Sequence, residues 1–233
     1  SFDKRLHWHC HFIQKLESEP MLEFSNMASA YDGLREDDFN AERFEAWVKG
    51  LTGYPMVDAC MRYLNATGWL NFRMRAMVVS FASYHLWLHW RPTGLHLARQ
   101  FLDYEPGIHY CQLQMQSGTT GINAVRIYSP IKQVADQDPE GTFIRRWIPE
   151  LAGVPAEHIA EPHLMSHDEQ LRYGCRIGHD YPKPIVEHRA AVAEAKRRVY
   201  GVRSRRDSRA EAQDVFQRHG SRRRPRDRRP VSY

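Results

Sequence analysis

The residues with the clearest potential for metal chemistry in this 233-residue sequence lie near its beginning. His7, Cys10 and His11 are spaced i, i+3 and i+4, so their side chains would share one face of a helix. A zinc site needs a fourth ligand, and no further residue is spaced to supply it. We therefore predict no metal site, and we interpret the histidines as core or surface residues of an aromatic-rich helix.

Other signatures of chemistry are missing from the sequence. It contains no GxGxxG, Walker A, HExxH or nucleophile-elbow pattern. The cysteines are far apart and form no CxxC, which argues against a secreted disulfide framework and indicates a reducing, cytoplasmic setting. The chain starts at Ser1 without a methionine, so we expect it to be a fragment of a longer protein.

The elements that must position any site are helices. Hydrophobic periodicity is helical nearly everywhere, so the predicted fold class is all-α. Residues 103–138 are polar with little periodic signal, and so long a polar segment inside a compact domain is usually functional. Helices are expected over residues 6–16, before Gly50, from Pro55 to Gly68, as one long apolar helix from Trp69 to Trp90, and over residues 141–151 and 184–199.

The charge is concentrated at one end of the chain. The formal net charge is +5, but residues 201–233 hold 11 arginines and four acids and carry +7, which leaves the rest near −2. We predict that this tail is disordered and that its arginines bind DNA phosphates without sequence preference. The most apolar stretch, residues 76–90, is too short to cross a bilayer, so no membrane partner is expected.

The most specific pattern in the sequence runs from Trp47 to Trp69 and reads W-x2-G-x-T-G-Y-P-x-V-D-A-x-M-R-x-L-x2-T-G-W. Shorter segments follow in order: R-x-R at 73–75, RIYSP at 126–130, G-x-F-I-R-x-W-x-P-E-L at 141–151 and Y-P-x-P-I-V-x-H at 181–188. Together they resemble the FAD-binding domain of the photolyase and cryptochrome family. We therefore divide the chain into a helical FAD-binding domain over residues 1–200 and a basic tail over residues 201–233.

The resemblance implies that FAD is held, bent back on itself, in a central cavity. Arg75 and Asp103 correspond to the family's paired arginine and aspartate beside the isoalloxazine, and Glu105 falls where relatives have a second aspartate. A buried flavin needs a cation and carboxylates near its polar edge. The alternative for Arg75 and Asp103 is a buried structural ion pair.

The same resemblance assigns residues to DNA and to electron transfer. Trp8 corresponds to a tryptophan that stacks on the damaged base and is expected to be catalytic as well as DNA-binding. Arg73 corresponds to a DNA-contacting arginine. Trp90 corresponds to the middle tryptophan of a three-tryptophan electron relay.

Several positions depart from the family pattern. Arg5 replaces a glutamate that contacts the dimer, Phe72 replaces an asparagine, and Leu113 replaces a second stacking tryptophan. In the relay, Cys111 and Asp37 stand where the first and last tryptophans would be. These departures put cyclobutane-dimer repair of the usual kind in doubt, although Tyr110 or Trp87 could substitute in the relay.

Three functions are compatible with these residues. The leading hypothesis is a photolyase-like flavoprotein in which light drives electron transfer from reduced FAD to pyrimidine dimers in DNA. The alternatives are a cryptochrome-like blue-light photoreceptor without repair activity and a noncatalytic protein that binds DNA through its tail. The family's phosphate-binding loop and antenna domain precede the position of Ser1, so we expect this chain alone to bind FAD weakly or not at all.

Overall fold

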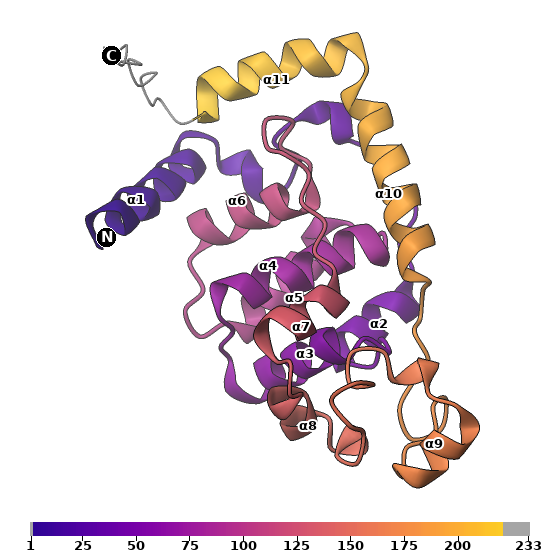
Figure 1. Ribbon diagram of the computed structural model, residues 1–233. Coiled ribbons are helices and arrows are strands. Elements are labelled where there is room, and N and C mark those ends of the chain that lie inside the picture. The colour runs from indigo at the N-terminus through magenta and orange to yellow at the C-terminus, as the bar shows by residue number, and fades with distance from the viewer. Residues whose placement is uncertain (1, 221–233) are drawn as a thin grey trace, which may run out of the picture.

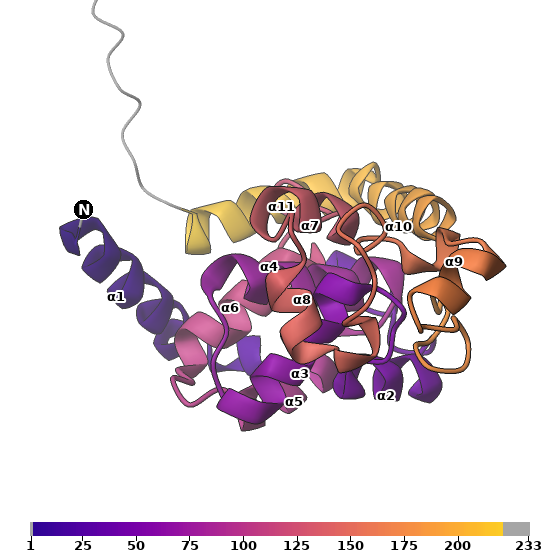
Figure 2. The ribbon, with the colours of Figure 1, turned by 60° about the horizontal axis from the view of Figure 1, so that its bottom comes forward.

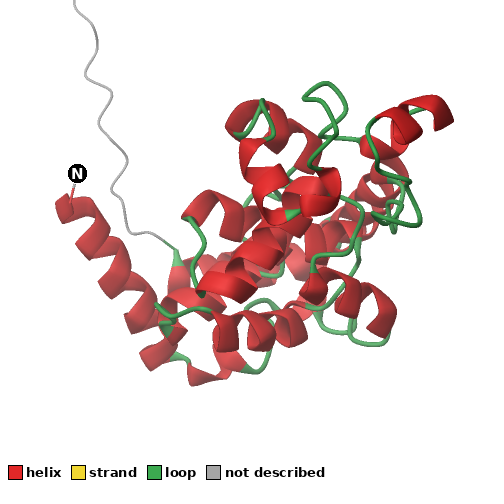
Figure 3. Cartoon of the chain, turned by 90° about the horizontal axis from the view of Figure 1, so that it is seen from below, coloured by secondary structure: helices red, strands yellow, loops and turns green. Residues whose placement is uncertain are grey.

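The computed structural model describes residues 2–220, with side chains from residue 6 onward, and every regular element in that range is a helix (Figures 1 and 3). The predicted all-α fold class is confirmed. The α-helices are α1 (Phe2–Ser18), α2 (Ala41–Lys49), α3 (Pro55–Thr67), α4 (Phe72–Ser80), α5 (Trp90–Gln100), α6 (Pro106–Ser117), α7 (Pro130–Gln137), α8 (Thr142–Trp147), α9 (His167–Arg172), α10 (His188–Arg203) and α11 (Arg206–His219).

Local sequence signals place the boundaries of α2 and α3 where they were expected. The Asn40 side chain caps α2, and Gly50 ends it with a left-handed φ of 64°. Pro55 opens α3, where its missing N–H needs no partner, and Gly68 ends α3 in the same left-handed conformation. A Cβ at Gly50 would lie 2.7 Å from the Asp58 carbonyl oxygen, so this position has no room for a larger residue.

The prediction of a single helix from Trp69 to Trp90 is wrong. After α4, residues Phe81–His85 form a π-helical turn, and the helix then breaks at Trp87, whose φ is 56°. The Trp87 indole N–H donates to Asp38 and the Arg35 guanidinium lies 4.4 Å from the ring centroid, which holds this rare backbone conformation. Because the segment is apolar on all sides, its pattern gave no sign of the break.

Two helices also occupy the polar segment that showed little periodicity. Both α6 and α7 begin with proline and are capped by the preceding side chain, Glu105 for α6 and Ser129 for α7. The helix α1 packs along α6, and Gly107 allows the close approach because a Cβ there would lie 2.8 Å from the Ile13 Cα. Figure 2 shows α1 at one end of the molecule beside α6.

The predicted disorder of the chain after residue 200 is wrong as far as His219. Helix α10 continues to Arg203, and α11 follows it across one end of the fold (Figure 1). The Glu211 carboxylate accepts hydrogen bonds from the Ser29 and Ala30 backbones, and Val215 is buried, so α11 is fixed by tertiary contacts that composition does not reveal. The remaining residues, 221–233, lie outside the described part of the chain.

Two buried clusters support these helices. The larger one surrounds α3 and α4 and includes Trp47, whose indole N–H donates to the Val78 carbonyl at 3.2 Å. The smaller one joins Tyr31 and Tyr84 to Val199 of α10. Within residues 2–220, no helix is both long and apolar enough to span a bilayer.

Candidate functional site: a cavity between α4, α5 and α6

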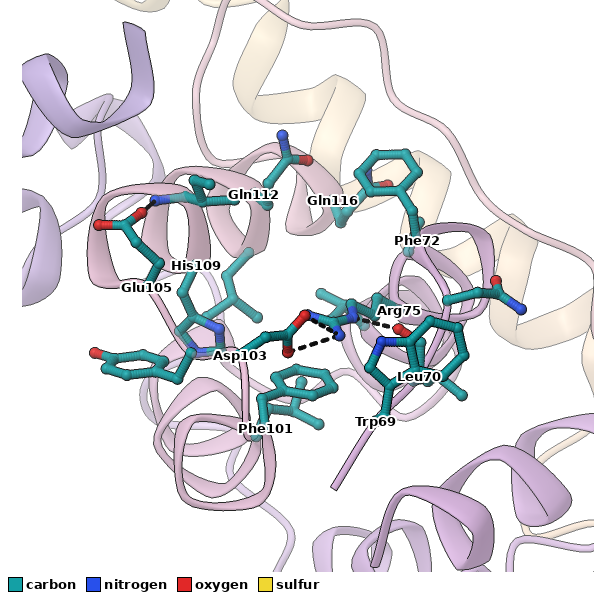
Figure 4. Close-up of a pocket in the computed structure, with 17 residues that line it drawn as sticks. Trp69, Leu70, Phe72, Arg75, Phe101, Asp103, Glu105, His109, Gln112 and Gln116 are labelled. Carbon is teal, nitrogen blue, oxygen red and sulfur yellow. Dashed lines mark hydrogen bonds and ion pairs between the residues drawn. The ribbon is translucent and has the colours of Figure 1, made fainter. Parts of the chain in front are cut away.

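A cavity of about 370 Å³ opens between α4, the end of α5 and α6 (Figure 4). This volume lies at the lower end of the range for small-molecule sites. Its wall is mostly apolar, and its polar groups come from α4, from the loop between α5 and α6, and from α6. The lining residues are Trp69, Leu70, Asn71, Phe72, Arg75, Ala76, Val79, Leu97, Phe101, Asp103, Tyr104, Glu105, Ile108, His109, Gln112, Leu113 and Gln116.

Arg75 and Asp103 meet in this cavity. One terminal guanidinium nitrogen of Arg75 donates to both Asp103 carboxylate oxygens, at 2.8 and 2.9 Å. The Arg75 Nε–H donates to the Leu70 carbonyl, and the guanidinium lies 4.0 Å from the centroid of the Phe101 ring. The Asp103 side chain is 53% exposed, so this is not a buried structural ion pair. The result is a cation held in one orientation at a cavity wall.

Glu105 also lines the cavity, but its carboxylate is engaged by α6. One oxygen accepts from the Gly107 N–H at 3.1 Å and the other from the Ile108 N–H at 2.7 Å. Both are unpaired donors of the first turn, so the carboxylate acts as an N-cap. The role of Glu105 beside a flavin stays a prediction.

The opposite wall carries polar residues of α6 that the sequence analysis missed. The His109 Nε2–H donates to the Gly94 carbonyl at 2.9 Å, and burial lowers the pKa of His109, so the ring is neutral at neutral pH. The Gln112 Oε1 is buried without a hydrogen-bond partner among the described residues, and Gln116 is almost fully buried. Glu105, His109, Gln112 and Gln116 are spaced i, i+4, i+7 and i+11, a helical stripe that would have been visible had α6 been predicted.

The other predicted site residues lie outside the cavity lining. Trp8 is half-exposed on α1 and stacks on Phe12 with ring centroids 5.7 Å apart. Arg73 is exposed on α4, next to the cavity residue Phe72. Their roles in binding DNA stay predictions.

Trp90 is fully buried, but it is connected toward the cavity through two tyrosines. The Trp90 indole N–H donates to Asn26 at 2.7 Å, and its ring centroid lies 6.4 Å from that of Tyr110. The Tyr110 and Tyr104 hydroxyls are 3.4 Å apart, and Tyr104 lines the cavity. The three aromatic rings therefore form a continuous series from the cavity wall into the core.

Residues 6–220 contain no group of three His, Cys, Asp or Glu side chains arranged to hold a metal ion. In the His7 to His11 segment, the His11 ring instead contacts the Trp8 ring edge at a centroid distance of 5.8 Å.

Comparison with known proteins identifies the class of domain. The protein-family model for the FAD-binding domain of DNA photolyase matches residues 2–201. The chain therefore belongs to the photolyase and cryptochrome family and contains its FAD-binding domain, as the sequence motifs indicated.

Individual relatives carry both family names. The chain is 39% identical to a deoxyribodipyrimidine photo-lyase of Alkalihalophilus pseudofirmus over 67% of its length, and 38% identical to a cryptochrome DASH of Gloeobacter violaceus over 66%. These matches cover 34% and 31% of the two relatives, so the chain spans about a third of their length.

Solved structures show the same relationship. A class III photolyase from Agrobacterium tumefaciens superimposes with a TM-score of 0.79 at 31% identity, covering 88% of this chain and 42% of that protein. A cryptochrome from Synechocystis superimposes with a TM-score of 0.78 at 30% identity, covering 84% of this chain and 41% of that protein.

Proposed function

We propose that the cavity between α4 and α6 holds the isoalloxazine ring of FAD, and that the full-length protein uses light to transfer an electron from reduced FAD to pyrimidine dimers in DNA. The observation that carries this proposal is the fixed Arg75 and Asp103 pair on the wall of a largely apolar cavity. The buried and unpartnered Gln112 Oε1 adds a polar group that a bound ligand could satisfy.

The lining suits a flat ring with one polar edge. Arg75 supplies a positive charge whose position is set by Leu70, Asp103 and Phe101. The amide of Gln112 can accept a hydrogen bond from a ring N–H, while the apolar wall excludes water. When bound, FAD would supply light absorption and the transferred electron.

The aromatic series gives a route for electrons into the cavity. Tyr110 replaces the relay function of the tryptophan missing at Cys111, and it lies between Trp90 and the cavity residue Tyr104. The Tyr110 hydroxyl donates to the Glu23 carboxylate at 3.1 Å, so Glu23 can take the phenol proton when Tyr110 gives up an electron. Burial raises the pKa of Tyr110, which keeps the phenol protonated until that step.

DNA is the proposed partner, and the cytoplasm is the proposed compartment. Arg73 is exposed beside the cavity residue Phe72, where a phosphate of an approaching strand could pair with it. Trp8 offers a half-exposed aromatic face on α1 for a base.

A cryptochrome-like photoreceptor is the second candidate, favoured by apolar residues at the cavity. Phe72 is 61% exposed there, where the family pattern has an asparagine that could hydrogen-bond a base. Leu113 is buried against Gly94 in place of a stacking tryptophan. A cavity with these two substitutions can hold a ring and still recognise a dimer poorly.

Illumination of the full-length, FAD-loaded protein with a dimer-containing oligonucleotide separates the two candidates. We expect intact bases to be restored in light and not in darkness, as measured by chromatography of the digested strand. The variant Phe72→Asn, which restores the family's amide, should repair faster. Absence of repair in both proteins with reduced FAD bound would contradict the repair proposal and favour the photoreceptor.

A further inference from the structure

A second recess lies at the elbow where α10 meets α11, and most of its lining follows residue 201, where the family match ends. Figure 1 shows the two helices joined at a sharp angle, and the recess encloses about 550 Å³ beside this joint. The family match ends at residue 201, so α11 and the joint before it lie beyond the matched residues. No residue in the described part of the chain lines both this recess and the cavity between α4 and α6.

The recess is positively charged. Arg203 and Arg209 line it from α10 and α11, and none of the described residues that line it is acidic. Two acids of the first turns of α11 are engaged elsewhere or exposed. Glu211 is held by the Ser29 and Ala30 N–H groups, and Asp207 is exposed in the first turn of α11. Among the described residues, the Arg203 guanidinium donates to the Asn123 carbonyl alone, at 3.1 Å, which leaves further N–H groups for a ligand.

Ser208 gives an independent sign that a ligand belongs in the recess. It lies in the first turn of α11, only 8% of its surface is exposed, and its Oγ has no hydrogen-bond partner among the described residues. A buried hydroxyl without a partner is destabilising. The N-terminus of α11 lies at the same place, and its capping residue Arg205 offers no side-chain acceptor to the free N–H groups.

We propose that this elbow binds a phosphate group. The Ser208 hydroxyl and the free N–H groups of α11 would donate to the phosphate oxygens, and Arg203 and Arg209 would balance its charge. Tyr200 lines the recess half-exposed, so a base attached to the phosphate has an aromatic face on which to stack. The phosphate could belong to a nucleic-acid strand or to a free nucleotide, and binding at the elbow does not require the flavin cavity.

The test is a titration of the 15N-labelled chain with inorganic phosphate, followed by NMR at the Ser208 and Arg209 amides. We expect saturable shifts at these amides and about tenfold weaker binding in Arg209→Gln. Arg172→Gln removes the same charge from exposed α9 and should leave the affinity unchanged. If the Ser208 and Arg209 amides show no saturable shifts, or if Arg209→Gln and Arg172→Gln bind phosphate equally well, the proposal is overturned.

Ser208→Ala is a second variant that should fold normally, because alanine fits the same space in the helix. It should also weaken phosphate binding severalfold while the other α11 amide signals keep their positions. Unchanged phosphate affinity in this variant would overturn the assigned role of the hydroxyl.

Two further ligands identify the source of the phosphate. Adding oligo-dT or a nucleoside monophosphate should shift the same amides. The ligand that binds more tightly shows whether the phosphate comes from a nucleic-acid strand or from a free nucleotide. For a strand, the log–log slope of affinity against salt should become shallower by about 0.7 when Arg209→Gln removes one phosphate-pairing charge. A nucleotide would bind the wild type and this variant with similar, shallow salt dependence. Failure of both ligands to shift the elbow amides would contradict the proposal whether or not the protein repairs DNA.

Discussion

Two aspartates of this chain lie in regions with opposite properties. Asp58 of α3 is fully buried, and its carboxylate accepts from the Thr52 N–H, the Thr52 hydroxyl, the Gly53 N–H and the Tyr181 hydroxyl. Asp103 is half-exposed, and Arg75 is its partner at the wall of a cavity. The first carboxylate has its acceptor sites filled by the protein, whereas the second keeps room for a ligand.

This difference shows that most of the recognisable sequence block, which runs from Trp47 to Trp69, is structural. Asp58 lies inside the pattern that runs from Trp47 to Trp69. Two other residues of that pattern are also structural: Trp47 is buried, and Arg62 pairs with Glu150 at 2.9 Å. None of these residues lines the cavity. Apart from Trp69 at its end, the block supports the cavity from behind, whereas most lining residues come from α4, from α6 and from the loop between α5 and α6.

The largest effect is expected at Asp58. Asp58→Ala would leave two backbone N–H groups and two hydroxyls without their acceptor in the core, so we expect a loss of about 3–5 kcal/mol in unfolding free energy. Tyr181→Phe removes a single donor and should cost about 1 kcal/mol. Urea denaturation of both variants measures the difference. Equal losses would mean that the buried network does not act through Asp58.

The next effect separates binding from stability at Asp103. Asp103→Asn breaks a solvent-exposed pair, so the unfolding free energy should change by less than about 1 kcal/mol. Because Arg75 loses the partner that orients it, FAD should bind the full-length protein about tenfold more weakly, or roughly 1.4 kcal/mol. Quenching of flavin fluorescence measures the affinity. A large loss of stability with unchanged affinity would place Asp103 in the same structural class as Asp58.

Much of this arrangement could be predicted from the sequence because it depends on local signals. The glycines and prolines that begin and end α2 and α3 are read directly from residue types. The meeting of Arg75 and Asp103 came from the family resemblance, since nothing in their spacing brings them together. The structure confirms that they are in contact.

The remaining features depend on tertiary contacts that no local pattern encodes. The helix break at Trp87 is held by Arg35 and Asp38, both distant in sequence. The helix α11 is arginine-rich and would be unstable alone, and its order comes from Glu211 and Val215 packing against residues 19–31. The polar stripe on α6 was missed for a different reason, because the helix has too little hydrophobic periodicity to be predicted as a helix.

Glu105 shares features with both Asp58 and Asp103, because its carboxylate is held by the protein and yet lines the cavity. Its substitution is expected to have a smaller effect on stability than that of Asp58. If its carboxylate acts as the cap of α6, Glu105→Ala should cost about 1 kcal/mol in unfolding free energy. FAD affinity should change little, because both oxygens are already occupied. Glu105→Asp, which restores the family's residue, serves as the control for length. A large loss of FAD affinity with unchanged stability would move Glu105 into the group with Asp103.

The smallest expected effect is on the pH dependence of the unfolding free energy, through the ion pair between Arg62 and Glu150. Burial raises the pKa of Glu150, but its hydrogen bonds with Arg62 and the backbone outweigh this and hold the pKa below its ordinary value of 4.5. A lowered pKa in the folded state stabilises the protein above pH 4.5, and this stabilisation is lost as the pH falls through the folded value. Because the pair is partly exposed, the difference between wild type and Arg62→Gln should be less than about 1 kcal/mol at pH 7 and should shrink by pH 3. Denaturation at both pH values measures it, and a difference that grows in acid would mean that Arg62 acts through packing rather than through Glu150.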